Sequence, residues 1–92
     1  MIYRHQQYEI DLTKVTRLYP AALISVGGER ASVSLEWADM KKEQIIFEAY
    51  VLICDFDPVG EVPMNRIEVQ FETKEELFGA MNDIALLLRE KR

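Results

Sequence analysis

Apolar and polar residues alternate along much of the chain before residue 73, which is the pattern of β-strands with one face on a core. The three segments that alternate most regularly are 8–12, 32–37 and 66–72. The side chains expected to face inward in the two longer segments are Val33, Leu35, Trp37, Ile67, Val69 and Phe71. A mostly antiparallel sheet with one solvated face is therefore expected.

The end of the chain changes to the three- and four-residue spacing of an amphipathic helix. Thr73 and Glu76 form a capping box, in which side chains satisfy free backbone donors at the helix start. Acidic residues follow in the first turn and basic residues in the last, which suits the helix dipole. The apolar stripe consists of Leu77, Phe78, Met81, Ile84, Ala85 and Leu88. The pattern predicts a helix over residues 74–90.

Segment 45–56 differs because both of its faces are apolar. One face carries Ile45, Phe47, Ala49, Val51 and Ile53, and the other carries Ile46, Tyr50, Leu52, Cys54 and Phe56. A strand of this kind must be covered on both sides. Either a strongly bent sheet wraps around it or a second subunit packs on the outside. Leu86, on the polar side of the predicted helix, favours a homodimer when taken together with this strand.

Glycine and proline mark the turns. Gly27-Gly28 separates residues 22–26 from the strand that begins at Ala31, which predicts a hairpin whose turn needs positive φ. Loops are expected at 38–43 and 57–65. We predict a single α+β domain over residues 1–92: a curved antiparallel sheet or partial barrel of about five to seven strands with one C-terminal helix. The alternative is an open antiparallel sheet with the helix packed on one face.

Two stretches carry a resemblance to a known class of domain. The order "YEIDLTKVTRLYP", a Gly-Gly hairpin and "IEVQFETKEELFGAMNDIALLL" resembles small bacterial domains of the pleckstrin-homology-like superfold. The resemblance implies a scaffold that binds peptides, protein partners or lipid, and it transfers no functional residues. Lipid-binding members usually present basic residues near the open end of the barrel, and no such cluster stands out in this sequence.

Charge is distributed unevenly. The 92 residues include 16 acids and 11 bases, a net charge of −5, which argues against nucleic acid or anionic membrane as a partner. Residues 1–46 hold six acids and six bases, whereas residues 47–76 hold eight acids and two bases. We therefore predict that a charged partner would be basic. The expected acidic partner-binding surface is Asp55, Asp57, Glu61 and Glu68.

Candidate chemistry is sparse. Cys54 is the one cysteine, so no internal disulfide can form, and the adjacent Asp55 disfavours a thiolate; buried packing is expected. His5 is the one histidine, and no nucleophile-elbow pattern surrounds a serine, so no catalytic residue is assigned. Asp55, Asp57 and Glu61 could hold calcium or magnesium, but their spacing matches no calcium loop, and a solvated strand end is the simpler interpretation. No cofactor or metal is predicted.

These observations favour a non-enzymatic protein-binding or scaffolding module. Recognition is expected along an exposed edge strand or in a groove beside the terminal helix. The alternatives are a small metal-dependent or acid–base enzyme that uses Asp55, Asp57 and Glu61, or a carrier of a small apolar ligand inside the curved sheet. The N-terminus has no apolar run behind its first basic residue, and no segment has the roughly 20 apolar residues of a spanning helix. A cytoplasmic location is expected.

Overall fold

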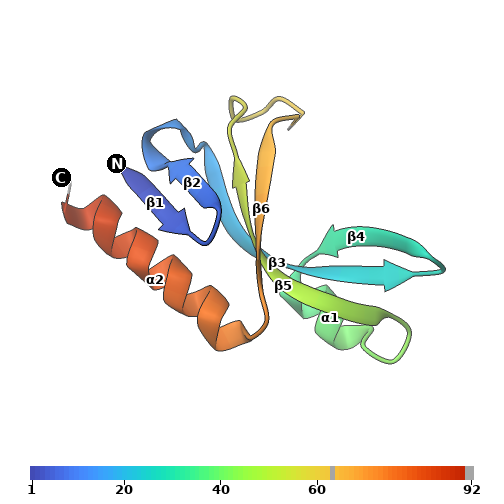
Figure 1. The fold of residues 1–92 in the computed structure, drawn as a ribbon. Helices are drawn as coiled ribbons and strands as arrows, with labels where there is room; N and C mark the ends of the chain where they lie inside the picture. The colour runs from blue at the N-terminus through green and yellow to red at the C-terminus, as the bar shows by residue number, and fades with distance from the viewer. Residues whose placement is uncertain (63, 91–92) are drawn as a thin grey trace.

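A computed structural model of the chain describes residues 1–62 and 64–90 (Figure 1). Within this part the fold is α+β, as predicted. Its elements are β1 (Ile2–His5), β2 (Tyr8–Asp11), the 3-10 helix η1 (Leu12–Lys14), β3 (Arg17–Val26), β4 (Glu29–Val33), α1 (Leu35–Met40), β5 (Ile46–Asp55), β6 (Arg66–Phe71) and α2 (Lys74–Glu90). No helix in the described part is long and apolar enough to cross a membrane.

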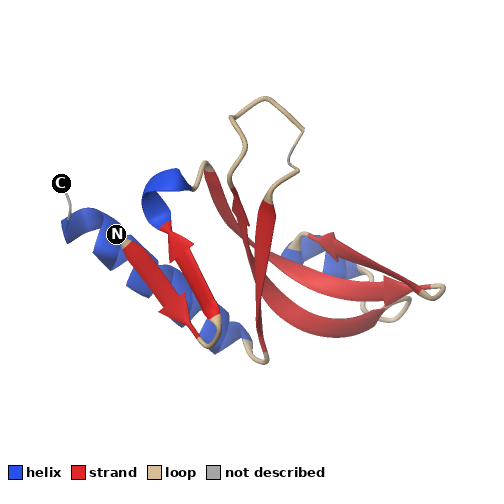
Figure 2. Cartoon of the chain, turned by 45° about the horizontal axis from the view of Figure 1, so that its top comes forward, coloured by secondary structure: helices blue, strands red, loops and turns tan. Residues whose placement is uncertain are grey.

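The six described strands form two antiparallel sheets. One is the β1–β2 hairpin, and the other has the order β4–β3–β5–β6. The long β3–β5 pair is the spine of the larger sheet (Figure 2). Strand β4 pairs with the second half of β3, and β6 pairs with the second half of β5, so the two edge strands lie at opposite ends of the spine. The sheets do not close into a barrel, which matches the open-sheet alternative.

The predicted C-terminal helix is confirmed over its full range. The Glu76 amide donates to Thr73 Oγ1 at 3.1 Å, and the Leu77 amide donates to the Thr73 carbonyl at 3.2 Å. The α2 residues that are buried in the main core are Leu77, Ala80 and Ile84. Phe78 is 45% exposed and Leu88 42% exposed, so the buried face of α2 is rotated about the helix axis relative to the predicted apolar stripe.

The position of the β1–β2 hairpin explains this rotation. Tyr3 and Ile10 belong to the same core cluster as Ala80, so the hairpin packs along the flank of α2 that the sheet leaves open. Figure 1 shows the hairpin lying beside α2, between this helix and the larger sheet. Because α2 is covered by the sheet on one side and by the hairpin on the other, it buries the residues that lie between these two neighbours. These residues are not at the centre of its apolar stripe.

The strand predicted over residues 32–37 is wrong in its second half. Strand β4 ends at Val33, and Ser34 caps α1 by accepting a hydrogen bond from the Trp37 amide at 3.1 Å. Trp37 is 40% exposed instead of facing a sheet core. The predicted loop 38–43 therefore begins inside a helix. A serine side chain that satisfies a backbone donor three residues on competes directly with strand pairing.

The Gly27-Gly28 hairpin is confirmed. Gly27 has φ of 57° and Gly28 has φ of 86°, and the two residues join β3 to β4. Positive φ at both central positions is the geometry of a two-residue turn that follows the right-handed twist of the strands.

Strand β5 is covered on both sides by its own chain in its second half. Leu52 and Cys54 lie in the main core beneath α2, whereas Val51 and Ile53 form a second cluster with Ala21 and Leu23 on the opposite face. No helix covers that second cluster in the part of the chain that the structure describes.

The curl of the sheet covers it instead. Ser32 on β4 donates to Glu68 Oε2 on β6 at 3.1 Å, so side chains of the two edge strands meet although neither strand pairs with the other. The bent-sheet alternative therefore accounts for Val51 and Ile53. A second subunit is not needed to cover them, and the homodimer through strand 45–56 and Leu86 stays a prediction.

A β-bulge changes which way the start of β5 faces. Ala49 lies opposite Leu23 and Phe47 lies opposite Ile24, so Glu48 is an extra residue in the ladder. The sequence pattern placed Phe47 on the same face as Ala49. The bulge turns it to the other face, where its ring lies 4.6 Å from that of Tyr50, centroid to centroid.

Candidate functional site

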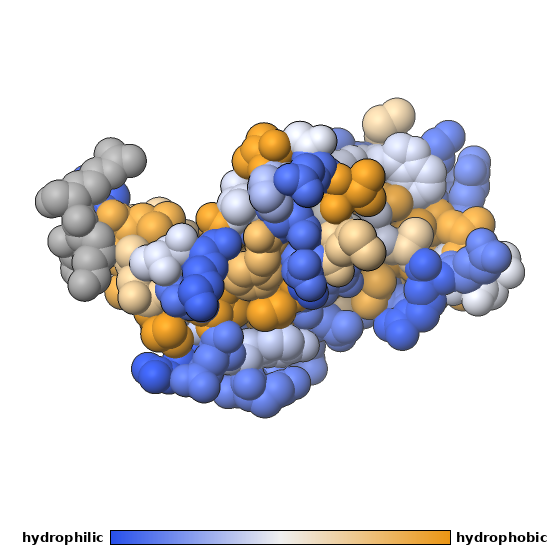
Figure 3. Space-filling model, turned by 90° about the horizontal axis from the view of Figure 1, so that it is seen from above, coloured by the Kyte–Doolittle hydropathy of each residue, from blue (hydrophilic) through white to orange (hydrophobic). Residues whose placement is uncertain are grey.

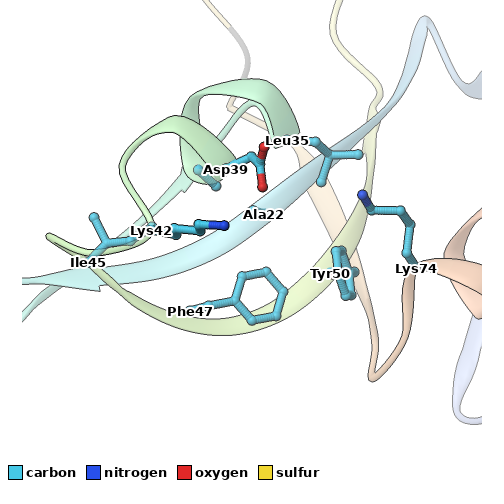
Figure 4. A pocket seen from close by; sticks show the side chains of 9 residues that line it. Ala22, Leu35, Asp39, Lys42, Ile45, Phe47, Tyr50 and Lys74 are labelled. Atoms are coloured by element: carbon cyan, nitrogen blue, oxygen red, sulfur yellow. The ribbon is translucent and has the colours of Figure 1, made fainter.

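The candidate site is a cleft between α1 and the start of α2, which we call the α1–α2 cleft (Figure 4). Its volume is about 190 Å³. Strands β3 and β5 form its floor, and α1 forms one wall. The residues that line it are Ala22, Leu35, Ala38, Asp39, Lys42, Ile45, Phe47, Tyr50 and Lys74. The cleft is thus apolar in its depth and charged at its rim.

Two local features of the sequence build the floor and the α1 wall of this cleft. The bulge at Glu48 brings Phe47 onto the floor beside Tyr50. The Ser34 cap starts α1 and so places its inner face over β3, where Ala38 is buried against Ala22 and Ile24.

The rim is held by backbone hydrogen bonds. The Lys41 amide donates to the Trp37 carbonyl at 3.1 Å, and the Gln44 amide donates to the Lys41 carbonyl at 2.8 Å. These bonds form the turn that carries Lys42. On the other side, the Thr73 cap starts α2 and thereby positions Lys74. Figure 4 shows both lysine side chains reaching toward the cleft from opposite sides, above the rings of Phe47 and Tyr50.

The rim charges are not neutralised within the described part of the chain. In this part, Lys42 and Lys74 have no carboxylate oxygen within 4.0 Å, and Asp39 has no basic nitrogen within that distance. All three residues are solvent-exposed. The cleft can therefore accept an apolar side chain on its floor while its rim offers two ammonium groups and one carboxylate.

The predicted acidic residues divide between two places. Asp55 is 1% exposed, and its Oδ1 accepts from Arg66 Nε at 2.8 Å; Arg66 Nη2 in turn donates to the Tyr19 hydroxyl at 3.1 Å. The hydrogen bond to Asp55 raises the pKa of Arg66. Glu68 Oε2 lies 4.0 Å from Arg66 Nη1 and accepts from Ser32. Asp55 and Glu68 thus hold the curled face of the sheet together.

Asp57 closes the loop 57–65. Its Oδ2 accepts from the amides of Met64 and Asn65, both at 2.7 Å, and its Oδ1 accepts from Asn65 Nδ2 at 3.0 Å. These hydrogen bonds lower the pKa of Asp57, and the bond from the Asn65 amide contributes most. Glu61 is exposed on the same loop, where its amide donates to the Pro58 carbonyl.

The structure does not assemble Asp55, Asp57 and Glu61, the alternative metal-binding trio, into a metal site. Among the described residues no three histidine, cysteine, aspartate or glutamate side chains lie close enough together to hold a metal ion. Asp55 and Asp57 each serve the fold, the first through Arg66 and the second through the loop amides. The acidic partner surface stays a prediction, with Glu61 as its exposed member.

The role of Asp57 leads to a pH prediction. Its folded-state pKa is lowered, so its stabilising contribution is present above the unfolded-state value, about 3.9, and is lost as pH falls through the folded-state pKa. Asp57→Ala is expected to destabilise the protein at pH 7 and to differ less from wild type at pH 3, as measured by urea denaturation. Glu61→Ala is the control, because its side chain makes no hydrogen bond in the described structure. A destabilisation by Asp57→Ala that is equal at both pH values would contradict this role.

Cys54 is buried, as predicted. Burial, with a smaller contribution from Asp55, raises the pKa of its thiol to about 11, so the reactive thiolate is scarce at neutral pH. The ring of His5 packs against that of Phe71, with 4.8 Å between centroids. Cys54 thus packs within the main core, and His5 packs at its edge.

Comparisons with known proteins add no assignment. No protein-family model, no curated protein and no solved structure matches the chain. Sequence reasoning missed the α1–α2 cleft because its lysines and aromatic rings come from separate segments. The local signals for its walls were two helix caps: Thr73, which the capping box identified, and Ser34, which lies three residues before Trp37 and was not recognised as a cap.

Proposed function

We propose that this chain is a non-enzymatic protein-binding module that receives a side chain of its partner in the α1–α2 cleft. One observation carries the proposal: an apolar floor, with Phe47 44% exposed, lies between two lysines that have no ion-pair partner in the described structure. An exposed aromatic residue surrounded by polar groups is typical of protein recognition sites. The cleft also lies beside the terminal helix, where a recognition groove was expected from the sequence.

The size of the cleft favours a partner's side chain over a free small molecule. Small-molecule sites usually enclose about 300–1,000 Å³ and bury most of their ligand. The α1–α2 cleft has about 190 Å³ and is open to solvent along its rim. A space of this size fits one large apolar side chain, and the remaining contacts would come from the surrounding surface.

Exposed apolar side chains also occur away from the cleft. They include Val59, Val62 and Met64 on the loop 57–65, and Leu86 on α2. Figure 3 shows, on the face seen from above, several apolar patches separated by hydrophilic side chains. Isolated exposed apolar residues are normal on protein surfaces. What supports the cleft as the recognition site is its combination of a hollow shape, an aromatic floor and unneutralised charge.

A selection of binding peptides tests the proposal. Wild-type protein is immobilised and a random peptide library is selected on it; we expect enriched peptides whose affinity falls about ten-fold or more in Phe47→Ala, measured by fluorescence polarisation. Phe78→Ala is the matched control, because Phe78 is equally exposed, at 45%, and does not line the cleft. Circular dichroism confirms that both variants fold. Failure to enrich any peptide, or enriched peptides that bind Phe47→Ala as well as wild type, would refute the proposal.

A further inference from the structure

The rim of the α1–α2 cleft differs in charge from the rest of the molecule. The chain as a whole has a net charge of −5, and residues 47–76 hold eight acids against two bases. At the cleft the balance is reversed, because Lys42 and Lys74 outnumber Asp39. Acidic residues are therefore abundant on this protein, but at the cleft a partner meets mainly positive charge.

The arrangement of the two lysines is directional. Lys42 follows α1 and Lys74 begins α2, so the ammonium groups approach the cleft from opposite sides with Phe47 and Tyr50 beneath them (Figure 4). Asp39 stands on the α1 wall, yet no oxygen of it lies within 4.0 Å of either ammonium nitrogen. An occupant with an apolar side chain on the floor would place its neighbouring groups next to the two lysines.

We infer that the partner segment is an acidic peptide, with one aromatic or large aliphatic side chain on the floor and carboxylates flanking it for Lys42 and Lys74. This inference rests on the proposed function. A basic segment would bring like charges together at both ends of the cleft, which is unfavourable. A neutral segment would leave both ammonium groups without a partner. Nucleic acid would also supply negative charge, but its affinity depends on several phosphate contacts from basic side chains, and the cleft offers two lysines.

Capped, fluorescein-labelled peptides with a central phenylalanine test this inference. The residues that flank the phenylalanine on each side are aspartates, asparagines or lysines, and binding is measured by fluorescence polarisation. The aspartate peptide is expected to bind most tightly and to lose affinity as salt rises. Lys42→Gln and Lys74→Gln should each weaken it about two- to five-fold, as expected for exposed ion pairs, without affecting the asparagine peptide.

Two further variants separate the effect of charge at the cleft from the effect of the chain's net charge. Lys14→Gln removes the same charge at η1, outside the cleft, and should leave binding unchanged. Asp39→Asn removes the opposing carboxylate from the rim and should strengthen binding of the aspartate peptide. A gain of affinity is a result that loss of folding could not produce.

The outcomes separate this inference from the proposed function. If the asparagine or lysine peptide binds as tightly as the aspartate peptide and binding still depends on Phe47, the cleft binds peptides but the acidic assignment is wrong. If no peptide of the three binds, and library selection also yields none, the proposed function itself fails. Binding of a single-stranded DNA oligonucleotide that depends on Lys42 and Lys74, in place of the aspartate peptide, would overturn the acidic-peptide assignment.

Discussion

Replacing Ile53 with alanine is expected to lower the free energy of unfolding by about 3 kcal/mol, within the range of about 2–5 kcal/mol for such truncations in a core. Ile53 is 2% exposed and packs with Ala21, Leu23 and Val51 on the face of the sheet that no described helix covers. The loss arises because the contacts of the removed atoms are not replaced when the surrounding residues relax only in part. Guanidinium denaturation measures it.

Ile46→Ala is the matched control. Ile46 is the same residue type on the same strand, but it is 68% exposed, so its truncation should change the free energy of unfolding by less than about 0.5 kcal/mol. A similar cost at both positions would contradict the conclusion that the curled sheet buries the second half of β5 and leaves the start of the strand exposed.

The same experiment tests the homodimer. If no second copy stabilises the fold, the unfolding midpoint of the wild-type protein stays constant over a tenfold range of protein concentration. A midpoint that rises with concentration shows that a second copy stabilises the fold. In that case Ile46 and Leu86, both exposed in the single chain, become the candidates for the dimer surface.

Replacing Arg66 with methionine is expected to lower the free energy of unfolding by about 3 kcal/mol. Breaking a buried ion pair typically costs about 3–5 kcal/mol, because the remaining charge is left without a partner. The lower end applies because the Arg66 side chain is 34% exposed, whereas that of Asp55 is 2% exposed. Methionine keeps much of the apolar stem of arginine, so the loss reports mainly on the charge.

Urea denaturation at pH 7 measures the cost of Arg66→Met. Arg30→Met is the control: Arg30 pairs with Glu48 at 3.1 Å, but its side chain is 59% exposed, and such pairs contribute about 0–1 kcal/mol. Equal losses for the two arginine variants would show that Asp55 does not depend on Arg66.

Several elements of this protein could be predicted because the information that defines them is local. The helix over 74–90 follows from a capping box and a three- and four-residue repeat within one segment, and the structure confirms its range. The Gly27-Gly28 turn and strand β6 follow from two glycines and from strict alternation. Each of these signals acts between residues close in sequence, so no knowledge of distant neighbours was required.

Where two local signals compete, the alternation of apolar and polar residues led to a wrong prediction. Residues 32–37 alternate like a strand, yet Ser34 also caps a helix, and the structure ends the strand at Val33. The choice depends on the contacts that the helix then makes, namely the packing of Ala38 against Ala22 and Ile24 from a different segment. Tertiary packing of this kind routinely overrides local preference.

The candidate site was beyond local prediction. Local patterns were enough to predict an α+β domain, a capped terminal helix, a glycine hairpin and a strand that needs cover on both faces. Three further features depend on contacts between distant segments: the sheet curls to provide that cover on one face, a bulge at Glu48 turns Phe47 toward Tyr50, and Lys42 and Lys74 lie on opposite sides of one cleft. The physical reason is that strand register and curl depend on pairing between distant segments, and a shift of one residue reverses the face to which every following side chain points.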